Sequence, residues 1–493
     1  MLSRDSFSKK ESGILMHISS LPSNYGIGSL GIEAYNFLDF LKESNQKYWQ
    51  ILPLVPLGEG NSPYKSASCF AGEILYIDID FLVRDGLLKK SDIPYYDFPK
   101  NVDFDAVRNF KLPLLKKAVK NIDKQSADYL KFLKENSSWI EDYAVFMAIF
   151  DEFKIESILD MPENLKYRIP KNLNDFKVVH KDDIEFYMLS QYLFFKQYFA
   201  LKEYANGLGI KIIGDIPIYI ALDSADVWTS PDNFKIGRAF IPESVAGVPP
   251  DLFSETGQLW GNPIYDWEYQ KQTDFYWWKN RLKFAHKIYD VIRIDHFRAF
   301  ADYYEIPYGS PDATVGSWRD GVGMEFWNSV KKDLGNIDII AEDLGEVSAA
   351  VVRLVKDSHF PNMKILQFAF SGDIYNPHLP QNYSENCVCY TGTHDNNTTL
   401  GWYNAALPHE QMAVDTLYPE SDDFPLPHNL IKAAMDSKAR LVIIPIQDYL
   451  SLDNSGRMNV PGVPKGNWSF RIEKDSICDE LLKTVKKITQ NRN

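Results

Sequence analysis

The chain has 493 residues, of which 45% are hydrophobic and 24% are charged, the balance of an ordinary folded globular protein. Its formal net charge of −14 repels nucleic-acid phosphates and anionic membrane surfaces, so neither is an expected partner. Residues 1–13 lack the apolar core of a signal peptide, and no apolar run approaches membrane-spanning length. With four cysteines in this length, the composition is typical of a cytoplasmic protein with reduced thiols.

Short apolar runs recur along the chain, most of them ending in polar residues and turn signals. They occupy residues 14–18, 48–54, 210–216, 291–295, 337–342, 363–370, 387–390 and 441–446. Such runs are typical of parallel strands that are buried on both faces. Helical patterns lie between them, for example at 32–42, 192–207, 276–288 and 324–334. The alternation predicts an α/β fold, and favours a closed (β/α)8 TIM barrel over an open doubly wound sheet.

Two insertions interrupt the barrel pattern, which we expect to occupy residues 1–81 and 182–493. Residues 82–181 are rich in Lys and Glu and have apolar residues at helical spacing, which predicts a mostly helical insertion subdomain. Residues 224–274 are rich in Pro, Gly, Trp and Asn. Long loops in compact domains are usually functional, so we expect a lid-forming insertion there, with a rigid structural loop as the alternative.

Four acidic residues lie at or just beyond the ends of predicted strands: Asp215, Asp295, Glu342 and Asp395. In a barrel these strand ends gather on one face, where active sites of this fold lie. A carboxylate at the end of an apolar strand is costly unless it is paired or functional. A helix cap or a surface turn could explain one such acid, but not all four together. Convergent carboxylates without a Cys/His metal cluster indicate glycosidic chemistry.

Two of these acids have neighbours that suit opposite roles. Arg293 shares a strand face with Asp295, so its positive charge should keep that aspartate ionised and nucleophilic. Glu342 lies beside Asp343 in an apolar setting, where desolvation and like charge should raise its pKa and let it hold a proton. A retaining mechanism then predicts that the carboxyl groups of Asp295 and Glu342 are about 5–5.5 Å apart.

Other polar and aromatic residues near these acids are candidates for binding a sugar. His296 and His394 form no zincin-type motif with the scattered acids, so we favour neutral imidazoles donating to sugar hydroxyl groups over metal ligation. The sequence has no phosphate-cradling Gly-rich motif and no calcium loop, and we expect neither cofactor nor metal. Within the predicted lid, ring platforms and hydrogen-bonding groups come from Asp251, Gln258, Trp260 and Asn262.

An ordered set of motifs covers nearly the whole chain. It includes HISSLPSNYGIGSLG from residue 17, NSPYKSASCFAG from 61, GDIPIYIALDSADVW from 214, RIDHFRAF from 293, AEDLG from 341, GTHDNNTTLGW from 392, IPIQDYL from 444, RMNVPG from 457 and GNWSFR from 466. Together with the GVPPD…WGNP lid segment, this set resembles the 4-α-glucanotransferases of the amylomaltase or disproportionating-enzyme type, within the α-amylase clan.

The resemblance implies a role for each matching residue. Asp295 matches the nucleophile, Glu342 the acid/base, and Asp395 a third carboxylate that binds sugar hydroxyls and stabilises the distorted ring. The implied substrate-binding residues are Arg293, His394, Tyr64, Asp215, Asp251, Gln258, Trp260, Asn262, His296 and Ser62.

The implied activity is transfer of an α-1,4-glucan segment to the 4-hydroxyl of glucose or a maltodextrin. It proceeds through a covalent glucosyl-enzyme with retention of configuration. The expected partners are therefore maltooligosaccharides and α-1,4-glucans. A retaining α-glucan hydrolase is the alternative enzyme, because water and a sugar hydroxyl use the same carboxylates. A non-catalytic glucan-binding protein is the second alternative, and the intact set of acids argues against it.

Overall fold

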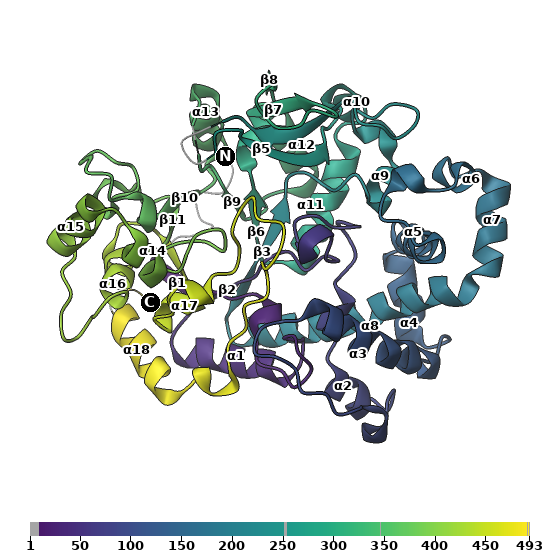
Figure 1. Ribbon diagram of the computed structural model, residues 1–493, viewed down its shortest axis with the longest axis horizontal. Helices are drawn as coiled ribbons and strands as arrows, with labels where there is room; N and C mark the ends of the chain where they lie inside the picture. Colours follow the sequence, from purple (N-terminus) through teal and green to yellow (C-terminus); the bar gives the residue numbers. More distant parts are fainter. Residues whose placement is uncertain (1–8, 251–253, 346, 491, 493) are drawn as a thin grey trace.

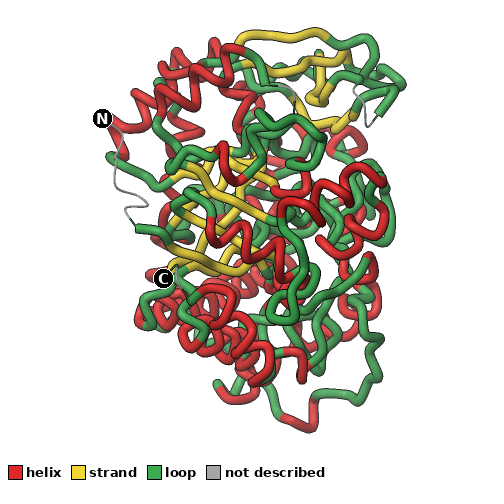
Figure 2. The backbone as a smooth tube through the Cα atoms, turned by 90° about the vertical axis from the view of Figure 1, so that its left-hand side faces the viewer, coloured by secondary structure: helices red, strands yellow, loops and turns green. Residues whose placement is uncertain are grey.

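A closed barrel of eight parallel strands lies at the centre of the computed structural model, which describes residues 9–250, 254–345, 347–490 and 492 (Figures 1 and 2). Around the barrel the strands follow the order β1-β12-β11-β10-β9-β6-β3-β2. Their bounds are β1 Glu11–Leu15, β2 Tyr48–Gln50, β3 Lys211–Pro217, β6 Val291–Asp295, β9 Ile339–Ala341, β10 Asn362–Ile365, β11 Cys387–Tyr390 and β12 Leu441–Pro445. Each overlaps one predicted apolar run, so the predicted (β/α)8 fold is confirmed.

The strands carry apolar residues throughout because both of their faces are covered. Every residue of β11 and β12 is buried, between the barrel interior and the surrounding helices. Helices outside the barrel include α1 Ile32–Glu43, α11 Tyr276–Ile288, α12 Gly323–Leu334, α13 Ala349–Ser358, α14 Thr399–Ala405, α15 Pro408–Leu417, α16 His428–Asp436, α17 Ile446–Tyr449 and α18 Asp479–Thr489. Among the described residues, none of the helices combines the length and apolarity needed to cross a membrane.

The segment 82–181 is mostly helical and lies to one side of the barrel, at the right of Figure 1. After α2 Ile79–Arg84 it contains α3 Phe104–Ala118, α4 Ala127–Glu135, α5 Ile140–Phe153, α6 Glu163–Lys166 and α7 Pro170–Val179. The long helix α8 Lys181–Gly207 follows and packs against α5 of this segment and also against α1 and β3. It therefore joins the helical segment to the barrel.

A second sheet lies above the barrel in Figure 1, with strand order β5-β4-β7-β8 and antiparallel pairing. Its strands are β4 Ser244–Val248, β5 Gln258–Pro263, β7 Asp302–Pro307 and β8 Ser317–Asp320, and the short helices α9 Ala225–Thr229 and α10 Trp267–Gln272 flank β4 and β5 in the chain. We expected a loop-like insertion at 224–274, whereas β4 and β5 make it part of a sheet. The sheet was missed because its two locally paired halves, β4–β5 and β7–β8, are joined by the pairing of β4 with β7, which lies beyond that segment.

Candidate active site

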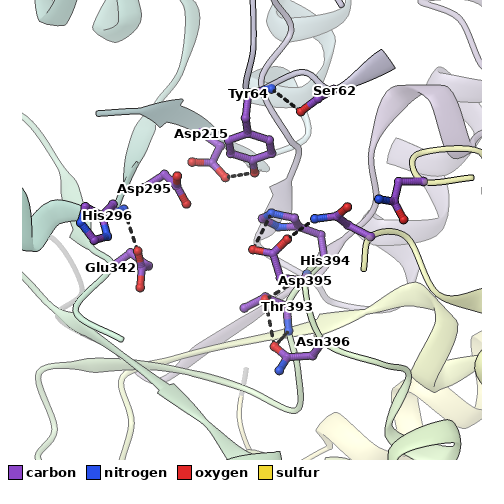
Figure 3. Close-up of polar contacts among 12 residues, drawn as sticks. Ser62, Tyr64, Asp215, Asp295, His296, Glu342, Thr393, His394, Asp395 and Asn396 are labelled. Carbon is purple, nitrogen blue, oxygen red and sulfur yellow. Dashed lines mark hydrogen bonds and ion pairs between the residues drawn. The ribbon is translucent and has the colours of Figure 1, made fainter. Parts of the chain in front are cut away.

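Three of the predicted acids lie at the carboxyl end of neighbouring barrel strands. Asp295 is the last residue of β6, Glu342 directly follows β9, and Asp215 lies near the end of β3. In spatial order β6 stands between β9 and β3, which brings the three acids together. Figure 3 shows Asp295 and Glu342 directed toward the same space, with Asp215 next to Asp295.

Arg293 connects two of these carboxylates. Its Nη1 donates to Asp215 Oδ2 at 2.5 Å, and its Nη2 lies 3.1 Å from Asp295 Oδ1. The strand register explains the first contact, because Arg293 is paired directly with Asp215 across β3 and β6. The second follows from alternation along β6, which puts Arg293 and Asp295 on one face as predicted. Tyr64 extends the network, since its hydroxyl donates to Asp215 Oδ2 at 2.7 Å.

Glu342 is buried and is held by main-chain donors. The N–H of His296 donates to Oε2 at 2.6 Å, and the N–H of Leu344 donates to Oε1 at 2.9 Å. His296 has a left-handed backbone conformation with φ of 52°, which a non-glycine residue adopts at a cost of order 1 kcal/mol or more. That conformation directs its N–H at the glutamate. Burial raises the pKa of Glu342, and Asp343 adds to the rise, while Arg293 and the two N–H groups oppose it.

The electrostatics of Asp295 differ from the expectation based on Arg293 alone. Burial is the largest influence and raises the pKa of Asp295; Arg293 opposes the rise, and the carboxylates of Asp215 and Glu342 add to it. Carboxyl groups this strongly coupled do not ionise independently, and the proton goes to the partner whose charge is less well compensated. Asp295 has a guanidinium in direct contact and a side chain that is 28% exposed, whereas Glu342 is buried. The guanidinium contact favours the ionised form of Asp295, and burial favours the protonated form of Glu342.

His394 and Asp395 lie on a loop, beyond the end of β11. The imidazole of His394 stacks on the ring of Tyr64, with centroids 5.1 Å apart and planes at 16°. His394 Nε2 lies 3.3 Å from Asp395 Oδ2. Burial lowers the pKa of His394, which keeps the ring neutral and able to donate or accept at a sugar hydroxyl. In Figure 3 the Asp395 carboxylate lies across the site from Asp295 and Glu342.

The sheet above the barrel brings Trp260 to the same site. The Trp260 indole packs edge-on against the His296 ring, with centroids 4.7 Å apart, and its Nε1 donates to Gln258 Oε1 at 3.1 Å. Asn262 is buried and donates from Nδ2 to the carbonyl of Ile220 at 2.8 Å, which fixes β5 to the barrel. The fourth lid residue predicted to bind substrate, Asp251, lies outside the described residues.

The remaining predicted residue, Ser62, contacts the main chain of Tyr64. Ser62 Oγ accepts the Tyr64 N–H at 3.2 Å, an interaction that orients the chain on which the ring is carried (Figure 3). The roles of Ser62, Gln258 and Asn262 toward a sugar stay predictions.

Several residues around Asp395 were not predicted individually. Asn459 Nδ2 donates to Asp395 Oδ1 at 2.6 Å, and Arg457 Nη2 donates to the Asp395 carbonyl at 2.9 Å. The Trp468 ring lies 5.7 Å from that of Tyr64 and 6.0 Å from that of His394. The signal for them was present in the RMNVPG and GNWSFR motifs, but only the fold shows that these segments return to the site.

Comparison with known proteins agrees with this geometry. The model of the 4-alpha-glucanotransferase family matches residues 16–476. The 4-alpha-glucanotransferase of Clostridium butyricum is 43% identical over 96% of this chain and 99% of its own length. That of Thermus thermophilus is 41% identical over 95% of this chain and 96% of its own length. A solved amylomaltase from Streptococcus agalactiae, in complex with acarbose, has a TM-score of 0.95 and 39% identity, and covers 98% of this chain and 99% of that one. The chain belongs to the 4-alpha-glucanotransferase family.

Proposed function

We propose that this 4-alpha-glucanotransferase acts by retaining double displacement, with Asp295 as nucleophile and Glu342 as acid and base. The observation that carries the assignment is the asymmetry of the two carboxyls. Asp295 contacts the Arg293 guanidinium at 3.1 Å, whereas Glu342 is buried against main-chain N–H groups and, among the residues that the structure describes, has no such contact to a cation. One group is thus suited to remain ionised and the other to hold a proton.

In the first step, Asp295 attacks the anomeric carbon of an α-1,4-linked donor glucan. The bond between that carbon and the glycosidic oxygen breaks, and Glu342 gives its proton to the departing oxygen. The donor segment is then bound to Asp295 as a glycosyl ester. Asp395, supported by Asn459 and His394, binds hydroxyls of the distorted sugar ring in this step.

In the second step, the 4-hydroxyl of an acceptor glucose or maltodextrin enters where the first fragment left. Glu342 takes the hydroxyl proton while the oxygen attacks the anomeric carbon and Asp295 is released. Two displacements on the same carbon restore the α-configuration. Arg293, Asp215, Tyr64, Ser62, His394, His296, Gln258, Trp260, Asn262 and Asp251 are the residues we assign to glucan binding.

Transfer requires that a sugar rather than water accept the donor segment. Trp260 supports this selectivity because its indole packs on His296, whose N–H holds Glu342. A ring at this position shields the acid/base from bulk water and offers an apolar face to a sugar.

Maltotriose distinguishes transfer from hydrolysis. We expect glucose together with maltodextrins longer than maltotriose, at a nearly constant number of reducing ends. A steady increase in reducing ends without longer products would identify a hydrolase instead. Binding of maltotriose with no turnover would support a non-catalytic role.

For the rest of the chain, we propose that residues 82–181 form a helical subdomain inserted between barrel segments 1–81 and 182–493. We also propose a cytoplasmic location, in which the four cysteines, all free in the structure, would stay reduced.

A further inference from the structure

Asp448 is a buried acid that the proposed mechanism does not use. It lies in α17, the short helix that directly follows β12, and only 1% of its surface is exposed. Because β12 and β11 are neighbours in the barrel, α17 stands beside the loop that leaves β11 and carries His394 and Asp395.

The Asp448 carboxylate binds both ends of that loop. Oδ2 accepts the hydroxyl of Thr391 at 2.6 Å and the hydroxyl of Thr399 at 2.7 Å, while Oδ1 accepts the Thr399 N–H at 2.7 Å. Thr391 is the first residue after β11, and Thr399 is the first residue of α14. One side chain therefore closes the segment 392–398 at its entry and its exit.

The carboxylate accepts all three hydrogen bonds, and an ionised aspartate is an acceptor at both oxygens. The Thr399 N–H can only donate, whereas the two threonine hydroxyls can donate or accept. An asparagine could therefore keep these contacts, and a side chain without polar atoms is needed to remove them. Burial raises the pKa of Asp448, and it is the hydrogen bonds from Thr391 and Thr399 that oppose the rise.

The position of Asp395 depends on this loop, whereas the position of Asp295 is set by strand β6. The Asp395 carboxylate is 41% exposed and its side-chain contacts are with Asn459 and His394. Near its exit the loop is also held by Gln367, whose Nε2 donates to the Asn397 carbonyl at 2.9 Å. The ends of the loop are held by Asp448.

We propose that Asp448 is a positioning residue for the transfer reaction: by holding Thr391 and Thr399, its carboxylate sets the position of Asp395 against the donor sugar. The inference rests on the proposed role of Asp395. Asp448 itself lies behind the loop and does not touch the substrate.

The test is Asp448→Ala, with Asp78→Ala as the matched control. Asp78 is also buried and accepts a hydroxyl and an N–H, from Ser29 at 2.6 Å and Phe81 at 2.8 Å, at the start of α2. Both variants should lose thermal stability. Only Asp448→Ala should lower kcat on maltotriose, by about 10- to 100-fold, with a much smaller change in KM. Unchanged kcat in a folded Asp448→Ala variant overturns the proposal.

A double-mutant cycle with Asp395→Asn separates positioning from general damage. If Asp448 acts through Asp395, the double variant should be little worse than Asp395→Asn alone, whereas fully multiplicative effects overturn the proposal. If Asp395→Asn alone leaves kcat unchanged, it is the proposed function that fails, and the cycle distinguishes that outcome.

Threonine variants keep the test valid if Asp448→Ala does not fold. Thr391→Val removes one donor to Asp448 and should lower kcat several-fold, while Thr391→Ser keeps the hydroxyl and should restore it. Equal kcat in the two variants overturns the proposal.

Discussion

The acids of this site are held in two different ways. Asp295 and Glu342 stand at the ends of β6 and β9, where strand register and main-chain N–H groups fix their place. His394 and Asp395 stand on a loop, and side chains from three other segments hold them: Tyr64, Asn459 and Asp448. In the proposed mechanism, the barrel thus positions the groups that make and break bonds, and a side-chain network positions the group that binds the sugar ring. Substitutions in the two regions should therefore impair the enzyme in different ways.

The largest effect is expected at the strand-end nucleophile. Asp295→Asn removes the attacking oxygen without changing the shape of the side chain, so kcat/KM should fall by about 10,000-fold or more. The matched control is Asp290→Asn, at the opposite end of the same strand, where Asp290 accepts the Ile212 N–H at 2.8 Å. That end of a barrel serves stability, so the control should melt earlier and keep its kcat. Equal losses of kcat in both variants would contradict the assignment.

Glu342→Gln tests the second strand-end acid through its pH dependence. Glu342 acts as acid only while protonated, so the first step should slow as pH rises through its pKa, which burial places above the ordinary glutamate range. Asp295 acts only while ionised, so the rate should also fall as pH drops through its pKa. The variant should lose about 100- to 10,000-fold on maltotriose. With α-maltosyl fluoride, whose leaving group needs no proton, the first step of the variant should keep its rate and have no alkaline limb. If the first step with the fluoride still slowed at alkaline pH, the alkaline limb would come from a group other than Glu342.

On the loop, a smaller effect is expected from Asn459→Ala. The substitution removes the 2.6 Å hydrogen bond to Asp395 Oδ1 but leaves the carboxylate in place. Steady-state kinetics on maltotriose should show a loss in kcat of about 10-fold, the scale of one hydrogen bond to a charged group. Asn454→Ala, an exposed position in the same segment, should match the unmodified enzyme. A loss as large as that of Asp395→Asn would mean that Asn459 itself binds the sugar.

The smallest effect belongs to the sheet above the barrel. Trp260→Ala should raise KM for maltotriose by about 5- to 10-fold, the scale of one aromatic contact, and should increase the share of hydrolysis. Trp318→Ala in β8 of the same sheet is the control, because Trp318 is partly exposed and packs on Tyr304 instead of His296. Reducing-end assays beside product analysis measure both quantities. An unchanged share of hydrolysis would remove Trp260 from the control of water access.

The sequence was informative where local pattern determines structure. All eight barrel strands were predictable because burial on both faces demands unbroken apolar runs, and Asp295 and Glu342 followed from their place at the ends of those runs. The sheet of β4, β5, β7 and β8 was not predictable in this way, since β4 and β7, which join its two halves, are far apart in the chain.

The features that the sequence did not predict depend on contacts between chain segments that are far apart in the sequence. Asp448 is 49 residues from Thr399, and Asn459 is 64 residues from Asp395. Local sequence patterns do not predict contacts between residues so far apart. Burial is the main influence on the pKa of Asp295, and it results from the residues that the folded barrel places around the carboxyl group. The neighbouring Arg293 alone could not indicate it.

The covalent intermediate on Asp295 is the most direct test of the account. Glu342→Gln treated with α-maltosyl fluoride should accumulate the glycosyl-enzyme, because the fluoride leaves without an acid and the second step lacks its base. Mass spectrometry of the denatured protein should show the mass of one added maltosyl unit, and peptide mapping should place it on Asp295. An adduct on Asp395 or Asp215 would contradict the assignment of the nucleophile, and turnover of the fluoride with inverted configuration would contradict double displacement itself.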